Sequence, residues 1–211
     1  MYKRQGGNIA ITGAGTGGVY LLSTSFVAAN NAATPTSGGN ITITGTGSSN
    51  YGFYQDSGAI TSFGSITIQG TASNYRGMFL GGAGAIKSVG DISIAAASTS
   101  GDWWAGRIEG NKLIQSTTGN ISMTGSGQAG WYVYGRVVAG NDTSNPTAGG
   151  TITVNSAGTN SYGLQLDTSI LLAHSAISIT ATNTSTHHVF RHEGATGSIK
   201  SNGNITIQAG N

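Results

Sequence analysis

The sequence predicts an all-β protein, a parallel β-helix (β-solenoid) with three strands per coil and about eight coils. Three observations predict this fold: one short motif recurs eight times, its residues alternate between apolar and polar, and turn-forming residues separate the pieces. Repeats with periods of about 20–50 residues are typical of arrays in which no single unit can bury its apolar face alone. No segment keeps a 3.6-residue period for long enough to predict a helix.

The repeated motif is a turn residue, a small or polar residue, and then Ile-x-Ile or a close variant. Its first isoleucines are 25 to 32 residues apart, at Ile9, Ile41, Ile66, Ile92, Ile121, Ile152, Ile177 and Ile205. Alternate side chains of a strand face opposite sides, so Ile41 and Ile43 should point inward while Thr42 and Thr44 face solvent. The motif therefore predicts the first strand of each coil.

Two further strands are expected in each coil. The second is rich in aromatic residues and follows the motif, as in Gly18–Leu21, Tyr51–Tyr54, Arg76–Leu80, Trp131–Tyr134, Tyr162–Leu166 and His187–Phe190. The third is short and precedes the next motif, as in Ala59–Ser62, Ala85–Ser88, Leu113–Ser116 and Ser198–Ser201. Gly, Asn and Ser lie between these segments, as turns require.

A longer repeat is superimposed on the coils. The first and fifth coils carry similar insertions, Ala29–Gly39 and Ala139–Gly150, whose prolines Pro35 and Pro146 are 111 residues apart. We expect residues 6–211 to be one β-solenoid segment of a longer protein, built from duplicated four-coil cassettes at about 6–118 and 119–211. Residues 1–5 resemble the translation of a sequencing adaptor, and we expect them to be non-native.

Composition narrows the classes of function. Only 8% of residues are charged, and without Lys3 and Arg4 the chain has 7 basic and 7 acidic residues. A balanced charge predicts no nucleic-acid partner and no anionic-membrane partner. The absence of cysteine excludes disulfides, thiolate metal sites and thiol nucleophiles, and no apolar run predicts direct membrane insertion.

The stretch from Gly6 to Asn211 resembles the repeat shafts of filamentous-haemagglutinin-like exoproteins, and related autotransporter passengers are similar. The resemblance is carried by Gly-Asn-Ile-Thr-Ile-Thr-Gly motifs, such as residues 39–45, and by the aromatic strand that follows. These exoproteins are bacterial adhesins exported by two-partner secretion. The resemblance implies that the parallel β-helix is right-handed. It also implies a secreted or cell-surface location, an outer-membrane secretion partner, and attachment to host cells, surfaces or other bacteria through partners such as glycans.

The candidate ligand-binding residues form an aromatic ladder on the second strands. By parity we expect these side chains to face outward: Tyr20, Tyr54, Phe79, Tyr132, Tyr134 and Phe190. Trp103 and Trp104 lie in the corresponding segment of another coil. Exposed rings could stack on sugars, although the alternative is that they only stack on one another between coils.

No catalytic, metal or cofactor site is expected. The carboxylates are few, and Asp56 and Asp167 occupy equivalent places four coils apart, about 19 Å along the axis. His188 and His192 share a strand face but would be about 13 Å apart, too far for one metal ion. The outward threonine file resembles an ice-binding array, but Gln69, Ala95, Asn155 and Gln208 interrupt it.

We therefore expect a structural and adhesive shaft segment of a large secreted or surface-anchored bacterial adhesin, and not an enzyme. Two alternatives remain open at this stage. One is a carbohydrate-binding or polysaccharide-degrading β-helix, and the other is an ice-binding solenoid.

Overall fold

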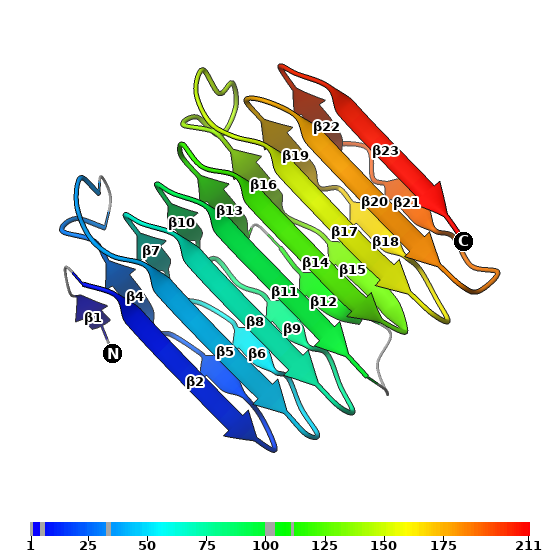
Figure 1. Ribbon diagram of the computed structural model, residues 1–211, viewed down its shortest axis with the longest axis horizontal. Coiled ribbons are helices and arrows are strands. Elements are labelled where there is room, and N and C mark those ends of the chain that lie inside the picture. Colours follow the sequence, from blue (N-terminus) through cyan, green and yellow to red (C-terminus); the bar gives the residue numbers. More distant parts are fainter. Residues whose placement is uncertain (1, 5–6, 33–34, 100–103, 111) are drawn as a thin grey trace.

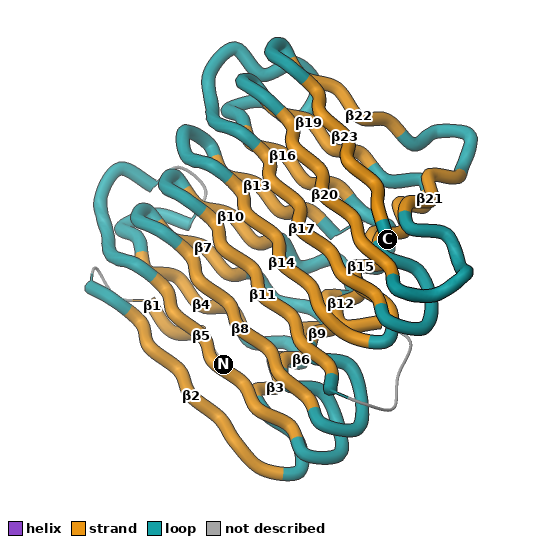
Figure 2. The backbone as a smooth tube through the Cα atoms, turned by 45° about the vertical axis from the view of Figure 1, so that its right-hand side comes forward, coloured by secondary structure: helices purple, strands orange, loops and turns teal. Residues whose placement is uncertain are grey.

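The computed structural model describes residues 2–4, 7–32, 35–99, 104–110 and 112–211. These residues form 23 strands and no helix, arranged as a three-sided stack of coils (Figures 1 and 2). Each side of the stack is one parallel sheet, of eight, eight and seven strands. The prediction of an all-β solenoid with three strands per coil is confirmed.

The Ile-x-Ile motifs build the sheet that faces the viewer in Figure 1, which we call the motif sheet. All but the last of its strands have seven residues, and the order follows the sequence: β2 (Ile9–Gly15), β5 (Ile41–Gly47), β8 (Ile66–Ala72), β11 (Ile92–Ser98), β14 (Ile121–Gly127), β17 (Ile152–Gly158), β20 (Ile177–Asn183) and β23 (Ile205–Gly210). Seven steps of about 4.8 Å give a stack about 34 Å long.

The second and third strands of the coils build the other two sides. The aromatic sheet contains β3 (Val19–Leu21), β6 (Phe53–Gln55), β9 (Met78–Leu80), β12 (Trp104–Ile108), β15 (Ala129–Val133), β18 (Leu164–Asp167) and β21 (Phe190–Glu193). The third sheet contains β1 (Tyr2–Arg4), β4 (Ser25–Ala28), β7 (Ile60–Ser62), β10 (Ile86–Ser88), β13 (Leu113–Ser116), β16 (Arg136–Ala139), β19 (Ile170–Ala173) and β22 (Ser198–Ser201).

The isoleucines of the motif stack in register and fill the interior. Ile41 pairs with Ile66, and Ile66 pairs with Ile92, while Thr42, Thr67 and Ser93 pair on the outer face. The first motif isoleucines from Ile9 to Ile177 are at most 2% exposed, as predicted. Ile205 and Ile207 are each 44% exposed because β23 has a neighbouring strand on one side only.

The two insertions have the same internal hydrogen bonds. Asn30 Oδ1 accepts from the Thr36 and Ser37 amides, and Asn30 Nδ2 donates to Thr36 Oγ1 at 2.7 Å. Asn141 makes the equivalent three bonds to Thr147 and Ala148, and each of these residues lies 111 positions after its counterpart. The shared bonding agrees with a duplicated cassette, which stays a prediction.

The insertions also explain apolar residues that face outward on the third sheet. Val138 alternates with the inward-facing Val137 and lies outside the apolar core cluster, yet it is fully buried. Gln115 Nε2 donates to Gly140 O at 3.0 Å, which ties the second insertion to this outer face. Strands β4, β16 and β19 were not predicted, since their residues lack the Ile-x-Ser pattern of the other third strands.

Residues 2–4, which we expected to be non-native, continue the third sheet. They form β1, which pairs in parallel with β4 so that Tyr2 lies beside Ser25. Their origin is a matter of the gene sequence, and the prediction stands untested.

Candidate functional site

The outer face of the aromatic sheet carries most of the predicted ligand-binding residues. The register of the seven strands gives one outward file: Tyr20, Tyr54, Phe79, Arg107, Tyr132, Gln165 and Arg191. Tyr134 follows two residues after Tyr132 and is 39% exposed. Five of the six residues predicted to face outward do so.

The prediction for Phe190 is wrong. Phe190 pairs with Leu164, whose side chain is fully buried, and it packs against the apolar core. The outward residue of β21 is its neighbour Arg191. The error arose because we placed the strand at His187–Phe190, whereas residues 184–189 form a longer corner and β21 begins at Phe190.

In the first coils the aromatic rings stack on one another along the axis. Tyr20 and Tyr54 are stacked with centroids 5.4 Å apart, and Tyr54 and Phe79 are stacked nearly parallel, with centroids 5.2 Å apart. Tyr51 packs edge-on against Tyr20 and at a tilt against Tyr54, and its ring centroid lies 4.7 Å from that of Tyr75. Because the faces are used between coils, the row presents mainly ring edges and hydroxyls, and burial raises the pKa of Tyr54.

A second aromatic cluster lies in the later coils. The rings of Trp104 and Tyr162 are stacked with centroids 5.6 Å apart although they are two coils apart, because the register partner of Trp104 in the intervening coil is the small Ala129. Arg107 lies over the Tyr132 ring at 4.9 Å, which is within range for a cation–π contact. Trp103 lies outside the described residues.

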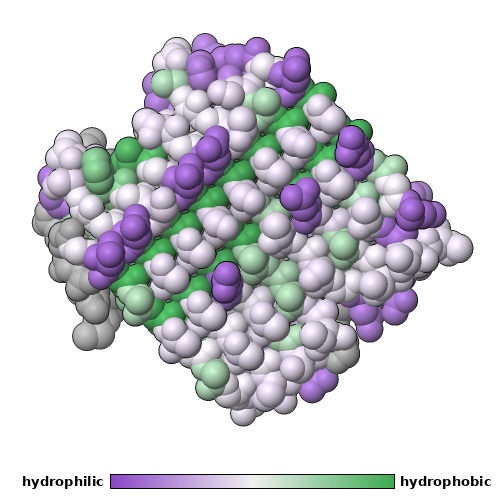
Figure 3. Space-filling view, in the orientation of Figure 1, coloured by the Kyte–Doolittle hydropathy of each residue, from purple (hydrophilic) through white to green (hydrophobic). Residues whose placement is uncertain are grey.

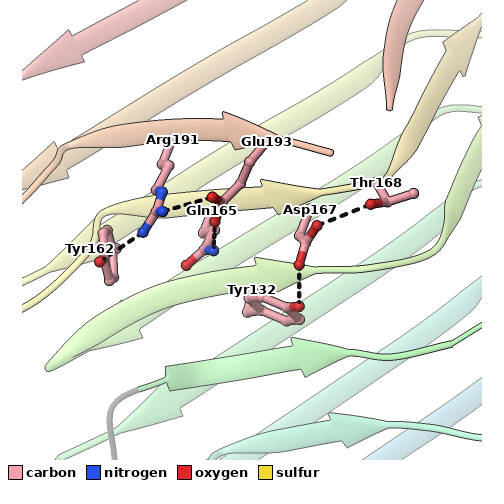
Figure 4. A network of polar contacts seen from close by, with 7 residues as sticks. All are labelled: Tyr132, Tyr162, Gln165, Asp167, Thr168, Arg191 and Glu193. Carbon is pink, nitrogen blue, oxygen red and sulfur yellow. Dashed lines mark hydrogen bonds and ion pairs between the residues drawn. The ribbon is translucent and has the colours of Figure 1, made fainter. Parts of the chain in front are cut away.

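Polar side chains next to this cluster form two neighbouring groups of contacts, one around Asp167 and one around Glu193 (Figure 4). Tyr132 donates to Asp167 Oδ2 at 2.8 Å, and Thr168 donates to Asp167 Oδ1. Burial and this bond to Asp167 raise the pKa of Tyr132 to about 12. Figure 4 shows the tyrosine and the threonine reaching the two oxygens of one carboxylate.

Asp167 and Glu193 are register partners on neighbouring strands, and sequence reasoning missed this pair. Gln165 donates to one oxygen of Glu193, and Arg191 lies 2.7 Å from the other. The signal was available in the spacing of Leu164–Asp167 and Phe190–Glu193, but the misplaced last strand hid it. Both oxygens of each carboxylate contact a neighbouring donor, which fixes the orientation of the pair on the sheet face.

A pocket lies at the corner between the motif sheet and the aromatic sheet. It has a volume of about 300 Å³ and is lined by Gln128, Asn160, Ser161, Tyr162 and His187. The sequence did not suggest it, because it depends on unequal corner lengths. The single residue Gln128 joins β14 to β15, whereas residues 159–163 join β17 to β18.

A larger hollow lies on the outer face of the motif sheet. Its volume is about 400 Å³, and small side chains such as Ala95, Ala97 and Ser126 line it between Gln69 and Thr180. Figure 3 shows this face as rows of weakly polar and apolar residues with isolated hydrophilic ones. It carries no group with evident chemical reactivity.

Among the described residues, no three or more His, Asp and Glu side chains come together in a group that could hold a metal ion. No helix in the described ranges is long and apolar enough to cross a membrane.

Comparison with models of protein families, with curated proteins and with solved structures finds no match for this chain.

Proposed function

We propose that this chain is a structural and adhesive shaft segment of a large secreted or surface-anchored bacterial adhesin, similar to filamentous-haemagglutinin-like exoproteins. The observation that supports it is the unbroken parallel register of three sheets through every coil. A stack of this kind is stabilised by neighbour-to-neighbour contacts along one axis, so it acts as a stiff spacer whose length grows with coil number.

Side chains, as well as the backbone, join successive coils along the axis. The ladder from Tyr20 through Tyr54 to Phe79 joins three consecutive coils. In the turns before the motif strands, Asn40 Oδ1 accepts from the Ser65 amide of the next coil, and Asn120 Oδ1 accepts from the Thr151 amide. These bonds run along the shaft and resist separation of the coils.

The outer faces carry few charged residues, which favours adhesion through many weak contacts rather than catalysis at one reactive site. Arg107 pairs with Glu109 and Arg191 with Glu193, so each arginine of the outward file is paired with a carboxylate. A polysaccharide-degrading activity is the less favoured alternative, because Asp167 and Glu193 are held by neighbouring donors. Ice binding is not taken further, since Gln69 and Asn155 interrupt the outward file in register.

The proposal is tested with beads that carry the purified chain on their surface. We expect them to adhere to bacterial or epithelial cells more than beads coated with an unrelated β-solenoid do. The chain should also release no fragments from acidic polysaccharides. Release of fragments that Asp167→Asn abolishes would contradict the shaft and show an enzyme instead.

A further inference from the structure

We infer that the corner pocket at Gln128 binds one residue of an uncharged glycan. The inference deepens the proposed adhesive function and rests on it, since it names the class of partner that the shaft would hold. It is carried by the shape of the pocket, by the hydrogen-bonding groups that line it and by the charges that it lacks.

The shape of the pocket follows from the backbone. The corner of the fifth coil is the single residue Gln128, so it is recessed below the corner at residues 159–163 of the next coil. The amides of Thr159, Asn160 and Ser161 all donate to Gln128 O, at 2.9 to 3.1 Å. These bonds fix residues 159–161 against Gln128, so the pocket is formed without a ligand.

Hydrogen bonds and ring stacking also fix the two lining residues on the opposite side of the pocket, Tyr162 and His187. Asn183 is fully buried and its Nδ2 donates to His187 O at 3.1 Å, which holds the corner of the seventh coil beside the pocket. Arg191 donates to the Tyr162 hydroxyl at 3.0 Å. The Tyr162 ring is further held by stacking with Trp104 and His188.

The polar groups that line the pocket are available to a ligand. The side chains of Gln128 and Asn160 and the Ser161 hydroxyl have no hydrogen-bond partner among the described residues, although Ser161 is only 8% exposed. Each amide offers two donors and an acceptor with two lone pairs, and a hydroxyl can donate and accept. Adjacent sugar hydroxyls, which also both donate and accept, match this set.

Charge decides between ligand classes. The lining contains no Asp, Glu, Lys or Arg side chain, and the nearby Arg191 is already paired with Glu193. The lining also includes His187, whose neutral imidazole both donates and accepts hydrogen bonds, as the hydroxyls of a sugar do. A phosphate or carboxylate ligand would need a cation, and an ammonium ligand would need a carboxylate. The volume of about 300 Å³ is at the small end of ligand sites, which suits a single pyranose.

The test is a ligand-observed NMR titration of the whole chain with methyl glycosides of glucose, galactose, mannose and N-acetylglucosamine, and with methyl glucuronide as a charged comparator. At least one neutral glycoside should bind, with Kd on the order of 1 mM, and more tightly than the glucuronide. Asn160→Ala and Gln128→Ala should each weaken binding about tenfold. The matched control is Asn155→Ala on the outer face of the motif sheet, which should leave binding unchanged.

Two outcomes would overturn the pocket assignment: no neutral glycoside binds, or Asn155→Ala weakens binding as much as Asn160→Ala does. Adhesion of coated beads without glycoside binding would leave the shaft proposal standing and remove this site from it. Glycoside binding that depends on Asn160, without bead adhesion, would keep the site and contradict the adhesive role.

Discussion

Trp131 lies beside Gly106, its register partner in the neighbouring strand, and fills the space that a side chain there would need. A Cβ on Gly106 would lie 2.4 Å from Trp131 Cζ3, and one on Gly125 would lie 2.5 Å from Trp131 Cδ1. Trp131 is fully buried, so one glycine in the aromatic sheet and one in the motif sheet make room for the largest residue of the interior. Packing at interior density leaves no slack for additional atoms.

We therefore expect Gly106→Ala to destabilise the protein by about 1–3 kcal/mol, because the methyl group overpacks the core against the indole. Chemical denaturation measures the change. Trp131→Leu combined with Gly106→Ala should recover part of the loss, since leucine is the residue found here in the next coil, at Leu164. Strictly additive losses in this double-mutant cycle would mean that the two residues do not compete for space.

The aromatic ladder predicts that a tyrosine stacked between coils stabilises the protein more than an exposed tyrosine without ring contacts does. Tyr54→Ala removes ring contacts with Tyr20, Tyr51 and Phe79, and should cost about 1–3 kcal/mol of unfolding free energy. Tyr134, which is 39% exposed and makes no ring contact with a described residue, serves as the matched control. Tyr134→Ala should change stability by less than about 0.5 kcal/mol. Equal effects of the two substitutions would argue against a ladder that stabilises the coils.

Lys112 predicts how stability depends on pH. It is fully buried, and its Nζ donates to Gly81 O at 3.1 Å. Burial lowers its pKa to about 7, against the opposing effect of the Asp56 carboxylate. In the unfolded chain the pKa is about 10.4, so the unfolded state binds more protons between these values and stability rises with pH.

The slope from this one group should approach, but not exceed, about 1.4 kcal/mol per pH unit. Urea denaturation between pH 7 and 9.5 measures it, below the range in which tyrosines with a raised pKa would lower stability. Lys112→Met should flatten the dependence, whereas Lys87→Met at an exposed position should leave it unchanged. The same slope in wild type and Lys112→Met would show that Lys112 is not the group responsible.

The insertions predict a local effect with little change in global stability. Asn141→Ala removes three hydrogen bonds that close the second insertion, to Thr147 and Ala148. Amide hydrogen exchange at Thr147 and Ala148 should become faster, while the motif strands keep their protection. Asn30→Ala should do the same at Thr36 and Ser37, and unchanged exchange in both variants would show that these bonds do not order the loops.

Much of the fold can be predicted from the sequence, because the stacked inward isoleucines require the same apolar–polar alternation in every coil. Ile41 and Ile66 are in one file, and any shift of one residue would turn both toward solvent. The same logic failed at Phe190, where a corner of greater length moved the strand start and reversed the facing of the side chains.

The candidate site was less accessible to sequence reasoning, for two physical reasons. The ladder residues were identified, but which ring faces stay open depends on the tilt of each ring against the next, as for Tyr54 and Phe79. The pocket at Gln128 depends on the difference in length between the corners of neighbouring coils. Corner residues do not repeat periodically, so their conformation cannot be predicted from the pattern. The polar contacts of Glu193 with Gln165 and Arg191 required the register of β21, which a local pattern does not fix.

Disulfide trapping tests the in-register parallel stack most directly, since the chain contains no cysteine of its own. Thr67 and Ser93 are register partners on the outer face of neighbouring strands, so Thr67→Cys with Ser93→Cys places two Cα atoms about 4.8 Å apart, within the range that a disulfide spans. Thr67→Cys with Ala95→Cys is the diagonal control, at about 8 Å and outside that range. Mild oxidation followed by mass spectrometry should show an intramolecular disulfide in the first variant and free thiols in the second. A disulfide in the diagonal variant alone, or in neither, would contradict the stacking of coils on which the whole account depends.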